Sequence, residues 1–287
     1  MGGNTPCVEL RVGDDVIILD AGTGIIPLGN ALVREDGVRS LHVVLSHYHW
    51  DHISGLPFFV PAFIPGWSID FYGPAESPAE LAHHISQQMK APYFPVETET
   101  WLADVRYHVS GEQELQLGDV RISHTTMHHP GLTYAYRIEV DGRVIVYAPD
   151  NELAFISQSI DARREEFDED EQPLLEAMKQ EQHWRGIEFM EDADVLIHDA
   201  QYTPEDYRKK RGWGHSCYLD TVRCALDARV KDLRLFSHDP NNDDVELDRI
   251  EGSAMELVSA HQSRMTCRLA REGVQIDLDS LPRRRRR

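Results

Sequence analysis

Short apolar runs alternate with amphipathic stretches along most of the chain, and turn residues separate them. The first third predicts a β-hairpin over residues 7–12 and 16–20, a helix over 25–33, strands over 41–46 and 69–72, and a helix over 78–89. The middle predicts strands over 105–109, 120–126, 134–140 and 143–148. Asp141 and Gly142 join the last two strands and are typical of a type I′ hairpin turn.

The pattern changes after residue 150. Residues 157–191 are polar and acidic, and they predict a helical excursion before a strand over 195–198. The last third predicts a helix over 217–228, a strand over 233–237, a long helix over 245–268 and a closing strand over 274–278. This order favours an α/β protein, an αββα sandwich in which two mixed sheets pack together with helices outside.

The domain organisation follows from the same pattern. No linker or repeat divides the chain, so we expect a single domain over residues 1–282 with an acidic helical insertion at 157–191. Residues 283–287 are five arginines, which we expect to form a disordered basic tail.

Charge and cysteine content narrow the function classes. The chain has 49 acidic and 29 basic residues and a formal net charge of −20, which disfavours an extended nucleic-acid surface and favours a small substrate. The 4 cysteines form no CxxC pair, which indicates reduced thiols. No apolar run is long enough for a membrane span and no secretory signal is visible, so we expect a soluble, cytoplasmic protein without a membrane partner.

A cluster of metal-ligating side chains directly follows the apolar strand over residues 41–46. His47 and His49 alternate along the chain and can converge on one point, whereas Asp51 and His52 follow a turn and can serve a second. Imidazoles suit zinc, iron or manganese, and a carboxylate makes the second point more tolerant of manganese. So many polar groups beside a buried strand need partners, which favours a metal site.

This HxHxDH loop resembles the hallmark of the metallo-β-lactamase superfamily. The resemblance implies that Asp20 orients the loop and that a later histidine is a further ligand. The His-Pro-Gly context after residue 127 favours His129, with His128 as the alternative. It also implies Asp150 as a bridging ligand and His238 as the last one.

The implied site holds two divalent ions, zinc or manganese, with iron as a further option. The expected ligands of the first ion are His47, His49, His129 and Asp150, and those of the second are Asp51, His52, His238 and the shared Asp150. Two ions roughly 3.5 to 4 Å apart generate a bridging hydroxide at neutral pH. That chemistry serves β-lactams, thioesters, lactones and phosphodiesters alike, so it does not choose a substrate.

Two later segments bear on the substrate. His215, in the stretch Gly-Trp-Gly-His-Ser, could donate a proton to a leaving alkoxide, with Asp199 orienting its ring and raising its pKa. Helix N-terminal amides after Gly214 could add an anion-binding field. In the alternative interpretation, His215 and Ser216 only cap a helix and Asp199 is a loop residue.

These segments resemble the phosphodiesterase branch of the superfamily, which includes RNase Z and proteins related to the phosphoribosyl cyclic-phosphate phosphodiesterases. Asp199 stands where that branch has a glutamate, which leaves the pairing with His215 open. Relatives also carry a short strand before the start of this chain, so we expect one sheet edge to be missing. The resemblance further implies a homodimer.

The sequence therefore predicts a metal-dependent hydrolase, a phosphodiesterase that acts on a small or cyclic phosphodiester through a metal-bridging hydroxide. His215, Asp199 and Asp51 are the expected catalytic residues, and Asp51 also counts among the metal ligands. The alternatives are a lactone or thioester hydrolase, a tRNA 3′-processing nuclease and a non-catalytic metal-binding sensor module.

Overall fold

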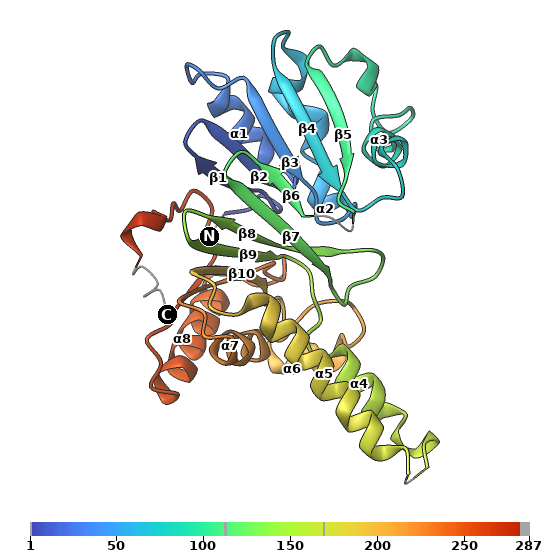
Figure 1. Ribbon diagram of the computed structural model, residues 1–287, viewed down its shortest axis with the longest axis vertical. Coiled ribbons are helices and arrows are strands. Elements are labelled where there is room, and N and C mark those ends of the chain that lie inside the picture. Colours follow the sequence, from blue (N-terminus) through green and yellow to red (C-terminus); the bar gives the residue numbers. More distant parts are fainter. Residues whose placement is uncertain (1, 112–113, 169, 282–287) are drawn as a thin grey trace. The chain divides into compact units, whose positions relative to one another are not determined.

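The computed structural model describes residues 2–111, 114–168 and 170–281 of the chain (Figure 1). The predicted tail at residues 283–287 lies outside these described residues. The chain divides into two compact units, Gly2–His124 and Thr125–Arg287, here called the amino-terminal and carboxyl-terminal units. The single domain over residues 1–282 and the insertion within it stay predictions.

A five-stranded mixed sheet forms the centre of the amino-terminal unit. Its strands lie in the order β1 (Val8–Val12), β2 (Asp15–Leu19), β3 (Ser40–Val44), β4 (Ser68–Gly73) and β5 (Asp104–Val109). The first two strands pair antiparallel, which confirms the predicted hairpin, and the other pairs are parallel. Helices α1 (Ile25–Leu32) and α3 (Pro78–Gln87) bury apolar residues in one core with this sheet, and the short α2 (Trp50–Ile53) follows β3.

A second mixed sheet has seven strands. The boundary between the two units falls inside one of them, β7. The strand order is β12 (Thr266–Leu269), β11 (Asp232–Phe236), β10 (Val195–Asp199), β9 (Arg143–Ala148), β8 (Tyr134–Val140), β7 (Val120–Thr126) and β6 (Leu115–Leu117). Strands β9 to β12 are parallel, whereas β8 and β9 form an antiparallel hairpin. Asp141 and Gly142 have φ of 50° and 72°, which is the left-handed backbone that the predicted type I′ turn requires.

Helices cover one face of the parallel strands in the carboxyl-terminal unit. Apolar side chains of α7 (Tyr218–Asp227), α8 (Asp244–Ala260) and the end of α5 (Gln172–Met190) share one buried cluster with strands β9 to β12. The predicted helical excursion is present as α4 (Phe155–Ala162) and α5, which run side by side away from the sheet (Figure 1). A short α6 (Pro204–Lys209), which the sequence did not predict, precedes α7.

The predicted end of the chain was wrong in two places. The helix expected over residues 245–268 ends at Ala260, because Gln262 adopts a left-handed backbone with φ 53°. The amides of Gln262 and Ser263 then donate to Ser259 and Val258, the hydrogen-bond pattern of a Schellman motif. Residues after this stop form the edge strand β12.

The closing strand expected over residues 274–278 is absent from the described chain. Strand β12 already pairs with β11 at that edge of the sheet. Val274 is 53% exposed, so its apolar side chain does not join the core. Two mixed sheets with helices nevertheless confirm the predicted α/β class. Across the described residues, we find no helix with the length and apolar character that a bilayer crossing needs.

Candidate metal centre

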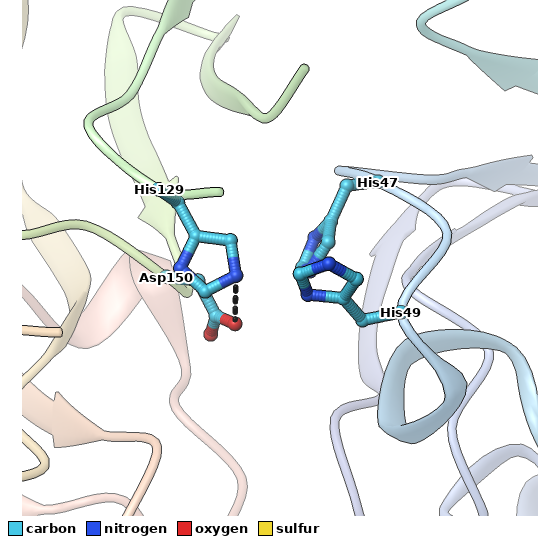
Figure 2. A group of neighbouring side chains, drawn as sticks. All are labelled: His47, His49, His129 and Asp150. Atoms are coloured by element: carbon cyan, nitrogen blue, oxygen red, sulfur yellow. Dashed lines mark ion pairs between the residues drawn. The ribbon is translucent and has the colours of Figure 1, made fainter. Parts of the chain in front are cut away.

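The HxHxDH loop begins at the carboxyl end of β3. Three of its imidazole rings lie together, with ring centroids 4.5 Å apart for His47 and His49 and 4.2 Å apart for His47 and His52. His47 and His52 are buried, whereas His49 is exposed. Figure 2 shows the first two of these rings side by side on their loop. The alternation that the sequence predicted therefore does bring His47 and His49 together.

Asp20 anchors this loop from the end of the neighbouring strand β2. Its fully buried carboxylate accepts hydrogen bonds from the Ser46 amide at 2.7 Å, the Ser46 hydroxyl at 2.8 Å and His52 Nδ1 at 2.7 Å. Since a carboxylate only accepts, Nδ1 of His52 carries the proton and Nε2 the lone pair. Asp20 thus orients a predicted ligand in the manner common for metal-binding histidines.

Ser46 extends the same arrangement to His47. The serine hydroxyl donates its proton to Asp20, so its oxygen can accept a hydrogen bond from His47 Nδ1, which lies 3.0 Å away. His47 therefore also presents the lone pair of Nε2. Asp51 is more open: its side chain is 52% exposed, and one carboxylate oxygen lies 3.4 Å from His52 Nε2.

In the carboxyl-terminal unit, His129 and Asp150 lie next to each other. His129 Nδ1 donates to the Gly214 carbonyl at 2.8 Å, which leaves Nε2 directed at Asp150, 3.5 Å from a carboxylate oxygen (Figure 2). Both side chains are nearly inaccessible to solvent. The ring of His128, the alternative ligand, instead stacks against Phe155 with centroids 5.8 Å apart.

Asp199 and His215 form a direct ion pair in the same unit. His215 Nδ1 lies 2.6 Å from Asp199 Oδ2, so the shorter aspartate side chain does reach the ring. The other carboxylate oxygen accepts the amides of Gln201 and Ser216, both at 3.1 Å. Burial raises the pKa of Asp199, while the hydrogen bond to His215 acts in the opposite direction.

Parallel strands bring this pair close to Asp150. Asp150 follows β9 and Asp199 ends the adjacent β10, so both lie at the carboxyl edge of the sheet. Asp150, Asp199 and His215 each offer an atom within 4.8 Å of the others. A buried group of two carboxylates and an imidazole is a chemically suitable environment for a divalent cation and for proton transfer.

His238 and the helix amides after Gly214 make contacts other than those expected of a metal ligand and of an anion-binding site. His238 follows β11, but its Nε2 interacts with the Ala270 carbonyl at 3.1 Å, and no candidate ligand group of the described chain includes it. Its role as a metal ligand stays a prediction. The amides of Gly214, Ser216 and Tyr218 all donate within the protein, which leaves little of the expected anion-binding field.

The sequence did not reveal the segment that connects these groups, Asn151 and Glu152. The Asn151 side chain accepts from the His128 amide at 3.1 Å, and the Asn151 amide donates to Asp199 at 3.2 Å. The carboxylate of Glu152 accepts the amides of Gly212 and Gly214, both at 2.9 Å. The run of three polar residues after a buried strand, Asp150, Asn151 and Glu152, is the sequence pattern that could have pointed to this segment.

The donors of each unit fit a divalent metal. His52 and His129 each have Nδ1 bonded to an oxygen that only accepts, and each therefore offers the lone pair of Nε2. Imidazoles combined with carboxylates suit zinc, manganese or iron. The chemistry of the donors thus agrees with the expected metals.

Comparison with known proteins places these features in context. A family model described as the beta-lactamase superfamily domain matches residues 16–169, which is more than half of the 287 residues. Ribonuclease Z of Thermococcus kodakarensis is 24% identical over 273 residues, covering 81% of this chain and 78% of that protein.

Solved structures share the fold at low sequence identity. The metallo-beta-lactamase fold protein YhfI of Bacillus subtilis has a TM-score of 0.64 and 20% identity, covering 94% of this chain and 90% of that one. A diphosphatase from the PhnP family has a TM-score of 0.57 and 15% identity, covering 95% and 84%. Both therefore support the metallo-β-lactamase fold for this chain.

Proposed function

Because this chain belongs to the beta-lactamase superfamily, we propose that it is a metal-dependent phosphodiesterase acting on a small or cyclic phosphodiester. The observation that carries the proposal is the pair of the fully buried Asp199 and the partly buried His215, joined at 2.6 Å beside Asp150. Such a pair can supply a proton to a leaving oxygen, which a nucleophile alone does not do. A phosphodiester with a poor alkoxide leaving group needs an acid.

The proposed metal ligands are those expected from the sequence. They are His47, His49, His129 and Asp150 for one ion, and Asp51, His52, His238 and the shared Asp150 for the other. When bound, two zinc or manganese ions would lower the pKa of a water molecule and neutralise charge on the phosphoryl oxygens. The oriented Nε2 atoms of His47, His52 and His129 support this assignment.

His215 is the proposed general acid. Asp199 holds Nδ1 of its ring and stabilises the protonated imidazole, so that Nε2 carries the proton that is transferred to the leaving oxygen. The ring is 15% exposed, which is enough for contact with a substrate while its partner is fully buried. Proton transfer by a positioned side chain contributes roughly 10²- to 10⁴-fold to such reactions.

The first test compares leaving groups. With the manganese- or zinc-loaded enzyme, we expect His215→Ala to slow hydrolysis of a 2′,3′-cyclic nucleotide, which releases an alkoxide, by roughly 10²- to 10⁴-fold. The loss on bis(p-nitrophenyl) phosphate should be much smaller, because p-nitrophenolate departs without a proton. The matched control is His261→Ala, which alters an exposed histidine at the end of α8 and should leave both rates unchanged.

Two results would overturn the proposal. A loaded wild-type enzyme that hydrolyses lactones or thioesters but no phosphodiester would favour the ester-hydrolase alternative. Equal losses on both phosphodiesters would remove His215 from the role of acid and leave it as a structural or metal-binding residue.

An RNA substrate is the second candidate, because the relatives named ribonuclease Z cover most of the chain. The net charge of −20 argues against it, since neutralising many phosphates needs clustered basic residues. We expect no tRNA binding at physiological salt in a gel-shift titration. Specific cleavage of a tRNA precursor at its 3′ side would reverse this choice.

The proposal includes a cytoplasmic homodimer. The four cysteines are free thiols, three of them buried, which suits a reducing compartment. Size-exclusion chromatography with light scattering tests the dimer directly.

A further inference from the structure

Glu152 is a buried carboxylate that the proposed chemistry does not use directly. Its side chain is almost fully buried, and it accepts three hydrogen bonds, all at 2.9 Å. One oxygen accepts the Tyr207 hydroxyl and the Gly212 amide, and the other accepts the Gly214 amide. Two of the three donors thus belong to the turn that precedes His215.

This turn has a backbone that only glycine adopts easily. Gly212 and Gly214 have φ of 78° and 87°. A Cβ atom on Gly214 would lie 2.4 Å from His129 Nδ1 and 2.4 Å from Pro130, closer than any real contact. The turn is therefore pressed against the loop that carries His129, and Glu152 binds it from within.

Gly214 connects Glu152 to two residues of the site. Its amide donates to Glu152, while its carbonyl accepts the hydrogen bond that fixes the ring of His129. The next residue is His215, whose ring meets Asp199. A shift of the Gly214 backbone would therefore move a proposed ligand and the proposed acid together.

The backbone around Glu152 is equally tied to the site. The Glu152 amide donates to the His128 carbonyl at 2.8 Å, and the preceding Asn151 amide donates to Asp199. Asp150 directly precedes this pair. The segment therefore links the end of β9, the His129 loop and the Asp199 and His215 pair.

We propose that Glu152 is a positioning residue that orients the side chains of His129 and His215 by holding the backbone of Gly214. This inference rests on the proposed function, since it assumes that His215 transfers a proton. It predicts an effect on kcat that depends on His215. If Glu152 only stabilised the fold, its replacement would lower the melting temperature and leave kcat unchanged.

The test replaces Glu152 by glutamine, an isosteric side chain whose NH₂ group would face an amide donor. We expect Glu152→Gln to lower kcat on the cyclic nucleotide roughly 10- to 100-fold with little change in KM, the usual cost of losing such an outer partner. In a His215→Ala background the same change should lower kcat less than it does in the wild type, because the part that acts through His215 is already lost and residues that act as a unit are non-additive.

Asp194→Asn is the matched control. Asp194 is a fully buried carboxylate of the same unit that accepts the Val144 amide and pairs with Lys231, at the start of the strands rather than at their ends. We expect it to lower the melting temperature while kcat stays within about 3-fold of the wild type. If Glu152→Gln does not fold, Glu152→Asp keeps the charge, withdraws it by one methylene and is measured in the same way.

A spectroscopic measurement separates this inference from the proposed function. The proton on His215 Nδ1, bonded to Asp199, should give a low-field NMR resonance that is lost or broadened in Glu152→Gln and kept in Asp194→Asn. If the wild type cleaves no phosphodiester, the proposed function fails, and the resonance still reports whether Glu152 positions the ring. An unchanged resonance, or an undiminished kcat loss in the His215→Ala background, would overturn the role of Glu152.

Discussion

Asp20 shows how one residue organises a site from outside it. Its backbone is left-handed with φ 59°, a conformation that aspartate tolerates better than most residues, and its carboxylate reaches three donors. Two of these bonds hold Ser46 and the third fixes the tautomer of His52. The resemblance predicted that Asp20 orients the loop, and the contacts within the amino-terminal unit support that role.

His198 provides a test of pH dependence at the residue scale. It is buried between the Asp199 carbonyl and the Asn151 side chain, and burial lowers its pKa to about 4. The unfolded chain has a histidine pKa of about 6.5, so it binds more protons than the native state between these values. The stability that neutral His198 contributes is therefore complete above pH 6.5 and is lost as the pH falls towards 4.

Urea denaturation of the metal-free protein at pH 7 and pH 5 measures this effect. Integrating the two pKa values gives a loss of about 2 kcal/mol from His198 over this interval. We expect His198→Gln to lose about 2 kcal/mol less than the wild type between pH 7 and 5. His261→Gln changes an exposed histidine and should retain the wild-type dependence. An identical dependence in His198→Gln would refute the prediction.

At the scale of elements, the parallel strands decide which polar residues meet. Asp150 and His238 follow β9 and β11, and Asp199 ends β10, which lies between these two strands in the sheet. Strand ends therefore deliver side chains to one edge from positions up to 88 residues apart (238 − 150). Which of them point at one another depends on local contacts, as His238 demonstrates by interacting with Ala270.

The end of α8 gives an element-scale prediction. Gln262 occupies the left-handed position of the Schellman motif, where glycine is strongly preferred. Gln262→Gly should raise the free energy of unfolding by about 0.5–1 kcal/mol, because relief of the strained backbone outweighs the added chain entropy. Gln262→Val should lower it by about 1 kcal/mol or more, since a β-branched residue resists this backbone. Urea denaturation measures both, and a destabilised glycine variant would contradict the role of this turn.

At the scale of the whole molecule, the predicted single domain and the proposed metals can be tested together. A single domain predicts one calorimetric transition for the metal-free chain, although its contacts form two units. Metal at about 100 times its dissociation constant adds about 2.7 kcal/mol to the native state. This should raise the transition temperature of a 287-residue chain by roughly 4–5 °C. Two separate transitions would contradict the single domain, and no shift with zinc or manganese would contradict the metal site.

Most strands and helices were predictable because their signals are local. The hairpin over β8 and β9 follows from Asp141 and Gly142, which accept a left-handed backbone. The end of α8 was not predictable, because glutamine is uncommon at the left-handed position after a helix and the apolar pattern continues through Gln262. Strand β12 forms because its neighbour β11 offers an unpaired edge, which is a tertiary property.

The types of side chain that can bind metal or transfer a proton could be recognised from the order of residues alone. The spacing after a buried strand indicated the candidate metal ligands His47, His49, Asp51 and His52. The Gly-Trp-Gly-His-Ser stretch indicated His215 as a candidate acid. These are properties of neighbouring residues, so they can be recognised without coordinates.

How those donors are oriented depends on contacts between distant parts of the folded chain. The bonds of Asp20 to His52, of Gly214 to His129 and of Glu152 to Gly214 join residues 32, 85 and 62 positions apart. Hydrogen bonds act over about 3 Å in space, so a partner far along the chain leaves no periodic signal in the sequence. The contacts of Glu152 can therefore be recognised only in the folded structure.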